Sequence, residues 1–385
     1  MSMRDAPDSE AALVEAEAEA LAAATPLDVA GAGSKRGFGR PTNAARIVST
    51  RALSGIRLYE PEELVMSAGA GTGVAEIETT LAAQGQMLAF EPPDLGAFYG
   101  GARGAGTIGG AFACNLAGPR RIKFGAARDH ILGIRAVSGR GEAFKAGGRV
   151  VKNVTGYDLG KLLAGSFGTL AIMSEITFKV LPAPEATRTL ILHGLDEATA
   201  LAAMTKALGS PNDVSGAAHD AARRVTMLRL EGFGPSVAAR ATALKNLLGG
   251  DIDESDDVAA WRALRDLDAL GGADCVWRLS LPPTESAGAV AAIARETTSR
   301  VIYDWGGARV FLAVPAANDA SAALVRRAAA AAGGHATLMR VPDAIRAGVG
   351  VFPPQPDALA ALTRRVKDAF DPQRILSPGR MYGAA

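Results

Sequence analysis

The sequence predicts an α+β protein that contains more than one domain, and three observations support this. Its 385 residues exceed what a single hydrophobic core usually holds. Glycine-rich loops separate short strand and helix patterns over roughly the first half of the chain, whereas strand patterns alternate with helix patterns from about residue 187 to 340. The composition, 48% hydrophobic and 21% charged, is that of an ordinary globular protein.

In the first half of the chain, sequence patterns predict a series of helices and strands. Ser9 is a candidate N-cap for a helix over 9–24, and a short strand is expected at 26–30. A second strand, 63–68, leads into a glycine-rich loop and a helix over 74–84, which Gly85 would end. Further strands are predicted at 131–138 and 167–180 because β-branched and aromatic residues are enriched there.

The second half repeats a strand–helix–strand pattern twice. The predicted strands are 188–193, 225–231, 276–281, 301–305, 310–314 and 336–340, and the predicted helices are 196–208, 236–248, 285–297 and 318–332. This order is typical of two split βαβ units on an antiparallel sheet, which suggests a ferredoxin-like α+β lid or cap.

The proline-rich tract 181–184 marks a predicted domain exit, and the expected domains are 1–184, 185–340 and a C-terminal segment, 341–385, that returns to the first domain. In that segment Asp357 would cap a helix that ends near Phe370, and 375–382 is expected to dock rather than fray.

Composition also excludes several classes of function. A formal net charge of +1 provides no broad field for nucleic acid or anionic lipid. Two cysteines and four scattered histidines form no disulfide scaffold and no metal motif, so no metal site is predicted. The acidic N-terminus is unlike a secretory signal, and no stretch of about 18 uncharged apolar residues is present. We therefore expect a cytoplasmic protein that meets a membrane only through partners, and whose chemistry depends on an organic cofactor.

The glycine loops could hold such a cofactor. Glycine allows backbone N–H groups to approach and bind phosphate oxygens, and Gly31-Ala-Gly-Ser-Lys35 follows a short strand, which suits a pyrophosphate; a plain surface turn is the alternative. No Walker A sequence is present. The Gly104–Gly109 segment matches the letters of a Rossmann fingerprint, but it follows no buried strand and opens no long helix, so we interpret it as a chance match.

Taken together, these loops resemble a known family. The motifs are Gly31-Ala-Gly-Ser-Lys35, Gly71-Thr72, Thr107-Ile-Gly-Gly110 with Asn115 and Gly118, Phe124-Gly125 with Arg128-Asp129, and Gly165-Ser-Phe-Gly-Thr-Leu170 with Glu175-Ile-Thr-Phe-Lys179. Their order resembles the FAD-binding domain of the vanillyl-alcohol oxidase and p-cresol methylhydroxylase (PCMH) superfamily. Further segments resemble the smaller FAD-binding subunits of bacterial glycolate oxidases: Gly85-Gln-Met-Leu88 with Glu91-Pro-Pro93, Val151–Leu159, Asp304-Trp-Gly-Gly307, Gly333–Thr337 and Pro378–Tyr382.

The resemblance implies a PCMH-type FAD-binding domain of two subdomains, with the pyrophosphate on the Gly31–Lys35 loop and the Gly106–Gly110 turn, and a cap domain. The cofactor-binding residues that it implies are Gly31, Gly33, Ser34, Lys35, Gly71, Thr72, Pro93, Thr107, Gly109, Gly110, Asn115, Gly118, Asp129, Lys152, Asn153, Gly156, Tyr157, Gly168 and Ile172. For residues 152–158, a solvated loop is the alternative. Since positions 31–39 contain no histidine, FAD should be bound non-covalently, and Cys114 is expected to be a small core residue rather than a flavin link. Trp305 and Phe352 are expected to pack in a core rather than over the flavin.

Oxidation of a 2-hydroxy acid needs a cation for the carboxylate and a base for the hydroxyl proton. His335 is the best candidate base because it lies inside a segment of the resemblance, and Arg278 is the candidate cation because it falls opposite Trp277 and Leu279 in a strand pattern. A structural role for His335 and a solvated strand face for Arg278 remain alternatives.

The function implied is that of an FAD subunit of a glycolate oxidase complex, which would oxidise glycolate to glyoxylate. Its expected partners are the larger FAD-binding subunit, an iron–sulfur subunit and a small 2-hydroxy acid. The alternatives are a non-catalytic or electron-relay flavoprotein needed for assembly, an independent FAD-dependent D-2-hydroxy-acid dehydrogenase, and a scaffold that has lost FAD, against which the intact glycine loops argue.

Overall fold

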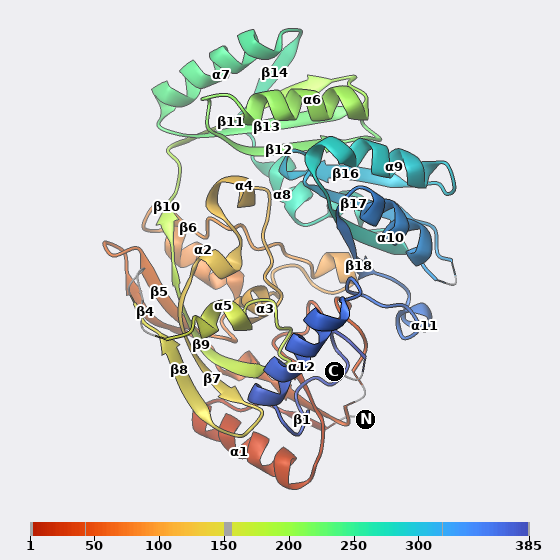
Figure 1. Ribbon diagram of the computed structural model, residues 1–385. Coiled ribbons are helices and arrows are strands. Elements are labelled where there is room, and N and C mark those ends of the chain that lie inside the picture. The colour runs from red at the N-terminus through yellow and green to blue at the C-terminus, as the bar shows by residue number, and fades with distance from the viewer. Residues whose placement is uncertain (1–2, 43, 150–155, 318, 384–385) are drawn as a thin grey trace. The chain divides into compact units, whose positions relative to one another are not determined.

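The computed structural model describes residues 3–42, 44–149, 156–317 and 319–383 (Figure 1). The chain divides into two units. Unit 1 contains residues 1–117, 125–183 and 354–385, and unit 2 contains 118–124 and 184–353. The units differ from the predicted limits at three places, since 118–124, Pro184 and 341–353 all belong to unit 2.

Unit 1 begins with a small parallel sheet in the order β1-β3-β2. Its strands are β1 (Met3–Asp5), β2 (Leu27–Ala30) and β3 (Arg46–Ser49), and helix α1 (Glu10–Ala22) lies between β1 and β2 in the sequence. Ser9 caps α1 as predicted, because its side chain accepts a hydrogen bond from the Ala12 amide.

The C-terminal segment returns to this sheet. The Leu27 amide donates to the Ile375 carbonyl at 2.7 Å, and the Ser377 amide donates to the Leu27 carbonyl at 2.7 Å. Leu376 and Leu13 of α1 are fully buried in the same hydrophobic cluster. Residues 375–377 therefore extend the edge of the sheet beside β2, which is the strand that leads into the first glycine loop.

The second sheet of unit 1 is antiparallel, in the order β4-β5-β9-β7-β8. The strands are β4 (Ile56–Glu60), β5 (Val65–Gly69), β7 (Ile131–Ser138), β8 (Ala143–Gly147) and β9 (Ala171–Lys179), with a separate pair formed by β6 (Gln86–Met87) and β10 (Leu181–Pro182). The associated helices are α2 (Val74–Ala82), α3 (Ile108–Ala113), α5 (Leu159–Leu163) and α12 (Asp357–Phe370).

Unit 2 is built from two βαββαβ repeats that share one eight-stranded antiparallel sheet, in the order β14-β11-β13-β12-β16-β17-β15-β18. The first repeat is β11 (Ala186–His193), α6 (Glu197–Leu208), β12 (Val214–Asp220), β13 (Val225–Gly232), α7 (Gly234–Leu248) and β14 (Ile252–Ser255). The second is β15 (Cys275–Ser280), α9 (Ser286–Ala294), β16 (Arg300–Asp304), β17 (Arg309–Val314), α10 (Ala322–Ala331) and β18 (His335–Arg340). Additional short helices are α4 (Arg121–Phe124), α8 (Ala259–Arg265) and α11 (Asp343–Arg346). The repeats join where β12 pairs with β16, so the predicted pair of split βαβ units is confirmed.

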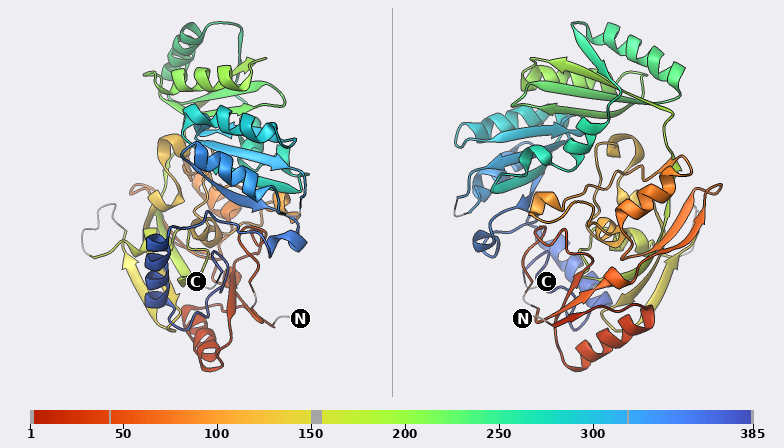
Figure 2. Two further views of the ribbon diagram at one scale, coloured as in Figure 1. Left: turned by 45° about the vertical axis from the view of Figure 1, so that its right-hand side comes forward. Right: turned by 180° about the vertical axis from the view of Figure 1, so that it is seen from behind.

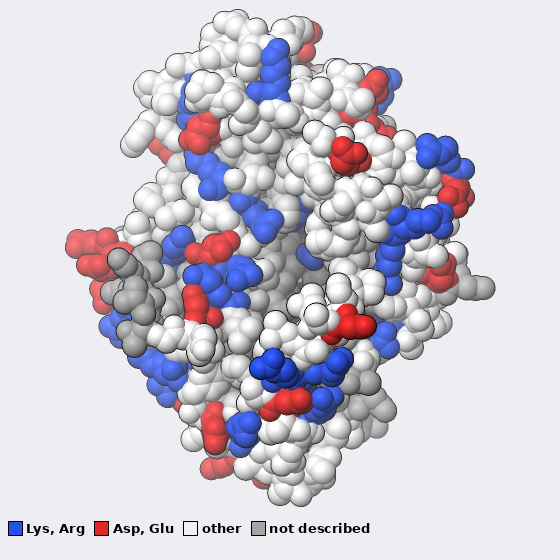
Figure 3. Space-filling view, viewed as in Figure 1, with Lys and Arg blue, Asp and Glu red and all other residues white. Residues whose placement is uncertain are grey.

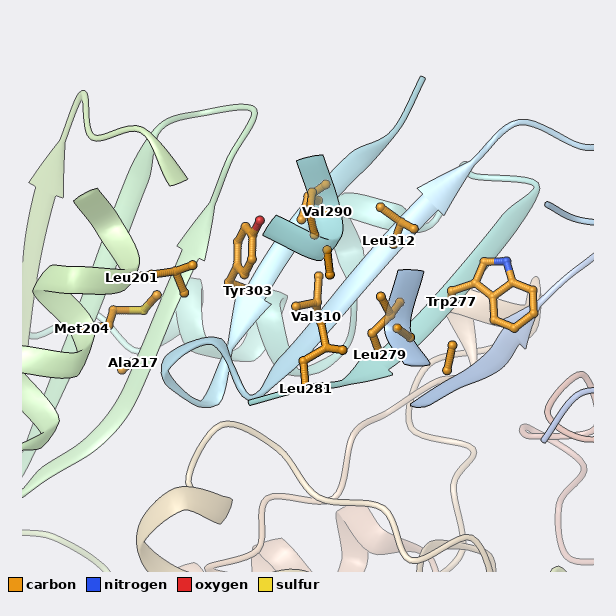
Figure 4. Close-up of a cluster of buried hydrophobic side chains, with 14 of the residues drawn as sticks. Leu201, Met204, Ala217, Trp277, Leu279, Leu281, Val290, Tyr303, Val310 and Leu312 are labelled. Carbon is orange, nitrogen blue, oxygen red and sulfur yellow. The ribbon is translucent and has the colours of Figure 1, made fainter. Parts of the chain in front are cut away.

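Helices α6, α7, α9 and α10 cover one face of this sheet (Figures 1 and 2). Alternate strand residues such as Trp277, Leu279, Val310 and Leu312 point toward these helices and form the core (Figure 4). The other face therefore carries the intervening residues of the same strands, among them Arg278.

Acidic and basic side chains are interspersed over the surface shown in Figure 3, in keeping with the formal net charge of +1. Within the described residues, no helix combines the length and apolar character needed to cross a membrane.

Candidate functional site

A cavity of about 100 Å³ lies in unit 1 where three segments meet: the loop after β2, the start of α3 and the turn before β9. Its lining includes nine of the predicted cofactor-binding residues: Gly31, Gly33, Ser34, Lys35, Thr107, Gly109, Gly110, Gly168 and Ile172. The two glycine loops that the sequence pairs as a pyrophosphate site therefore do lie together.

Close backbone packing explains why glycine is needed in these loops. A Cβ atom at Gly31 would lie 2.5 Å from Thr107 Oγ1, and one at Gly109 would lie 2.7 Å from the Ala70 carbonyl oxygen. Thr107 caps α3 by accepting a hydrogen bond from the Gly110 amide at 3.3 Å. A side chain at Gly31 would thus clash with the Thr107 side chain that caps α3.

Lys35 places a positive charge inside this cradle. The residue is only 9% exposed, and its ammonium group lies 3.4 Å from the position of a Cβ at Gly106. The ammonium group donates a hydrogen bond to the Ser34 hydroxyl at 3.4 Å, and burial lowers the pKa of the amine against weaker opposing effects of Cys114 and Asp94. An anion in the cavity would compensate this buried charge, so the residues present fit a pyrophosphate.

Arg380 braces the first loop from the C-terminal segment. Its guanidinium donates to the carbonyls of Phe38 at 2.6 Å, Arg36 at 3.2 Å and Arg40 at 3.1 Å, and its side chain also lines the cavity. Gly39 has a φ of +101°, and a Cβ there would lie 2.9 Å from Arg380 Nε. The Pro378–Tyr382 motif thus has a physical role, which is to hold the loop that carries Lys35.

Besides Tyr157, six predicted residues that the structure describes in unit 1 do not line this cavity. Thr72 is fully buried, and its hydroxyl donates to the Gly69 carbonyl at 2.7 Å, while Gly71 packs against the backbone of residues 50 and 51. Pro93 is half-buried. The Asn115 side chain accepts from the Arg128 amide at 3.0 Å, and Asp129 accepts from the Ala126 amide at 2.8 Å. Gly156 is exposed.

The remaining candidate cofactor-binding residues either do not line the cavity or lie outside the described residues. Tyr157 is 93% exposed, and Gly118 belongs to unit 2. Lys152 and Asn153 lie outside the described residues. For all of these residues, a role in FAD binding stays a prediction.

Several lining residues were missed by sequence reasoning. They are Asp28, Val29, Ala30, Ala32, Arg36, Thr50, Ala70, Ala113, Cys114, Phe167, Ala171, Met173 and Arg380. Most are small or apolar residues at the ends of strands and helices, where no sequence pattern separates a cavity wall from a core. Ala32, Phe167 and Arg380 had a signal, since they lie in motifs already singled out.

The two candidate catalytic residues lie on adjacent strands of unit 2. Arg278 of β15 faces Thr337 across the antiparallel pair, and Ser280 faces His335. Burial lowers the pKa of His335, and the nearby Arg278 guanidinium lowers it further. The imidazole is therefore neutral near pH 7 and can accept a proton.

Trp305 has a more specific environment than the predicted core packing. It is half-buried, its indole nitrogen donates to the Gly118 carbonyl at 3.0 Å, and the guanidinium carbons of Arg309 and Arg121 lie 3.7 Å and 4.4 Å from its ring centroid. Phe352 is partly buried and packs against the core of unit 2. Trp305 thus serves to hold the 118–124 segment.

Comparisons with known proteins agree with this geometry. Residues 2–147 match a family model described as an FAD binding domain. Glycolate oxidase subunit GlcE of Escherichia coli K12 is 36% identical over 379 residues, which covers 97% of this chain and 98% of that protein. Glycolate oxidase subunit GlcD of Bacillus subtilis strain 168 is 35% identical over 135 residues, or 35% of this chain and 27% of that protein.

Among solved structures, p-cresol methylhydroxylase with substrate bound superposes with a TM-score of 0.74 at 13% identity, and the match covers 98% of this chain and 88% of that chain. At this identity the likeness shows the fold alone. The predicted α+β, PCMH-type fold and the predicted FAD cofactor are confirmed.

Proposed function

The chain belongs to the family of the glycolate oxidase subunit GlcE, and from this premise we propose that it is the FAD-binding subunit of a complex that oxidises glycolate to glyoxylate. The alignment over nearly the full length of both proteins is the observation that carries the proposal. In this proposal the electrons pass from FAD to an iron–sulfur partner, and a larger flavin subunit completes the complex.

Lys35, Gly31, Thr107 and Gly110 would hold the FAD pyrophosphate, since they bring a buried ammonium group and two glycine turns to one cavity. When bound, FAD supplies an acceptor for the two electrons of the substrate. The first loop has no histidine, which supports non-covalent binding. Cys114 is half-buried and lines the cavity, so it is not the core residue that the sequence predicted.

Arg278 and His335 are the residues that we assign to the 2-hydroxy acid. Arg278 would bind the carboxylate, and the neutral His335 imidazole would take the hydroxyl proton. Because His335 must be neutral for this step, kcat/KM should fall as the pH drops through a pKa below 6.5. The complex carrying His335→Gln should lose this dependence together with most of its activity.

A second candidate function is a flavin subunit that relays electrons or completes the complex while the larger subunit performs the substrate chemistry. The observation that favours it is that relatives of this chain carry the names of two different glycolate oxidase subunits, GlcE and GlcD.

The test is to co-express the chain with a larger flavin subunit and an iron–sulfur subunit, and to count flavin per chain. Lys35→Met should remove flavin from this chain while leaving the apoprotein folded, because it replaces a buried ammonium by an apolar side chain of similar length. Lys145→Met, at an exposed lysine of β8, is the matched control and should retain flavin.

Anaerobic addition of glycolate to the purified chain then separates the two candidates. Bleaching of its bound flavin supports the catalytic assignment, whereas bleaching only within the complex supports the relay. If no flavin co-purifies with the complex, the proposed function is wrong.

A further inference from the structure

The five-stranded sheet of unit 1, in the order β4-β5-β9-β7-β8, has two chemically different faces (Figure 1). One face packs against α2, α3 and α5 and forms a hydrophobic core. Helix α1 covers the end of the other face that includes Val137 and Ile172. Because side chains alternate along a strand, that second face also carries the polar sequence neighbours of the core residues: Ser67, Arg135, Lys145, Glu175 and Thr177.

A recess of about 180 Å³ lies among these polar residues. Gly133 and Gly148 line it without contributing side chains, and a Cβ atom at Gly133 would lie 2.8 Å from the Gly148 carbonyl oxygen. The Gly148 amide donates to the Leu132 carbonyl at 3.1 Å, which holds the two backbones together. This close backbone contact places the next residue, Arg149, in the lining of the recess.

Arginine and lysine side chains are concentrated in the lining, which includes Arg57, Arg135, Lys145 and Arg149. A register shift between Ile56 and Leu58 makes Arg57 the extra residue of a β-bulge, a feature that redirects a side chain. Arg135 lies directly opposite Lys145 in the antiparallel pair of β7 and β8. Like charges at directly opposed positions are destabilising, so an anion bound between them would stabilise the sheet.

The recess has more positive than negative charge. Its lining contains a carboxylate, that of Glu175, while Arg135 is paired with Glu10 of α1. The other three cations form no ion pair with any residue in the described part of the chain. Since Arg135 and Glu10 cancel, three cations against the Glu175 carboxylate leave a formal charge of +2.

Two hydroxyl groups hold Glu175 in this lining. The Ser67 hydroxyl donates to Glu175 Oε1 at 2.6 Å and accepts from the Thr177 hydroxyl at 3.2 Å. Ser67 is only 3% exposed, so the carboxylate is oriented by a buried donor. A carboxylate fixed beside the cations accepts a hydrogen bond from a ligand hydroxyl and repels a second anionic group.

We infer that this recess binds a small phosphate monoester that carries a hydroxyl group. Such a monoester has a charge of about −1.5 to −2 at pH 7, which matches the formal charge of the lining. Arg57 and Arg149 would bind the phosphate oxygens, Lys145 would add a compact charge, and Glu175 would accept from the ligand hydroxyl. The recess and the proposed FAD cavity share no lining residue.

Isothermal titration calorimetry of the FAD-saturated chain with glycerol 3-phosphate tests this site, because bound FAD occupies the other cavity. The ester should bind at one site per chain, and potassium chloride should weaken it. Inorganic phosphate should bind more weakly, since it has no second group to reach Glu175. Lys145→Met should weaken ester binding while retaining flavin, so the two measurements report separate cavities. Should the chain bind no FAD, the same titration in Lys35→Met tests the recess without the other buried cation.

Further variants separate a specific site from general surface charge. Arg57→Met and Arg149→Met should each weaken ester binding about tenfold, because each removes a charge-assisted contact. Arg57→Lys should restore part of the affinity, since it keeps the charge but not the bidentate geometry. Glu175→Gln should tighten inorganic phosphate about threefold by removing a nearby negative charge. Arg364→Met, at an exposed arginine of α12 outside the recess, is the control and should bind the ester as the wild type does.

Two results would overturn the inference. The first is that the ester does not bind saturably at millimolar concentration, or binds Arg57→Met and Arg149→Met as tightly as the wild type. The second comes from vesicles that contain phosphatidic acid, which distinguish a lipid headgroup from a free ester. Binding to these vesicles that glycerol 3-phosphate does not displace would assign the cations to a membrane surface instead of a small-molecule site. Displacement by the ester would support the recess.

Discussion

Glu17 of α1 offers a quantitative test of the packing in unit 1. The residue is fully buried, and neither carboxylate oxygen has a hydrogen-bond partner among the described residues. Burial raises the pKa of Glu17, and the neighbouring Asp371 carboxylate raises it further, to about 8. We predict that Glu17→Gln stabilises the protein near neutral pH.

The size and sign of the effect follow from proton linkage. A glutamate whose pKa is raised on folding contributes stability that is fully present below its unfolded value of 4.5 and is lost as the pH rises toward about 8. At about 1.36 kcal/mol per pKa unit, the free energy of unfolding falls by about 3 to 4 kcal/mol between pH 5 and pH 8 on account of this one group. Glutamine cannot ionise, so the free energy of unfolding of the variant does not fall with pH on account of this residue.

Urea denaturation at pH 5, 6, 7 and 8, with FAD at one fixed concentration, measures the prediction. The variant and the wild type should have nearly equal stability at pH 5, and the variant should be more stable by about 3 kcal/mol at pH 8. Titration of other groups cancels in the difference. Glu15→Gln, at an exposed position of the same helix, is the control and should follow the wild type at every pH. A difference between Glu17→Gln and wild type that does not change with pH would refute the reasoning.

Three further substitutions test separate features. Gly31→Ala should weaken FAD binding about tenfold, or about 1.4 kcal/mol, because the added Cβ would lie 2.5 Å from Thr107 Oγ1. Equilibrium dialysis with FAD measures this change. Asp371→Asn should lower the free energy of unfolding by about 3 to 5 kcal/mol in urea titrations, because it leaves the buried Lys367 ammonium without its ion-pair partner. Gly288→Ala should raise the thermal midpoint and add about 0.5 to 1 kcal/mol, since Gly288 is exposed within α9 and a Cβ there would enter open space.

Most helices and strands with a clear periodicity of apolar residues were predictable from the sequence. β7 has the predicted bounds, and β15, β16, β17 and β18 each lie within one residue of the predicted ones, because alternating apolar residues facing the helices dictate both the strand and its register. The start of the strand predicted at 167–180 was wrong: β9 begins at Ala171, because Phe167 and Gly168 have positive φ and form the turn that lines the cavity.

β12 was missed, and the reason is physical. Its sequence, Val214-Ser-Gly-Ala-Ala-His-Asp220, has weak strand propensity, yet it lies at the centre of the sheet between β13 and β16. Pairing on both sides, rather than local preference, makes it a strand. Gly216 also allows the Trp261 ring to approach, since a Cβ there would lie 3.0 Å from it.

Part of the site was predictable, because glycines in a sequence indicate places where the backbone closely approaches another group. Gly31, Gly109 and Gly168 line the cavity, but residues such as Ala113 and Met173 reach it only through tertiary packing. The assignment of 118–124 to unit 2 was equally invisible, because an Arg–Glu pair separated by 111 residues has no local signature.

The open face of the unit 2 sheet differs between the two repeats in a way that bears on substrate binding. In the first repeat, the Glu231 carboxylate forms ion pairs with both Arg229 and Arg120. In the second, burial lowers the pKa of His335, and the nearby Arg278 guanidinium lowers it further.

This difference gives the proposed catalytic pair a property that can be measured. A substrate carboxylate bound at Arg278 would cancel part of the potential that keeps His335 deprotonated, so its pKa must rise when substrate binds. Since kcat/KM reports the free enzyme and kcat reports the substrate complex, the acidic limb of kcat should have the higher apparent pKa. Arg278→Met should raise the apparent pKa of the acidic limb of kcat/KM, so that it approaches the apparent pKa of the acidic limb of kcat. If both limbs coincide in the unaltered complex, Arg278 does not bind the carboxylate, and the face of the second repeat serves another purpose.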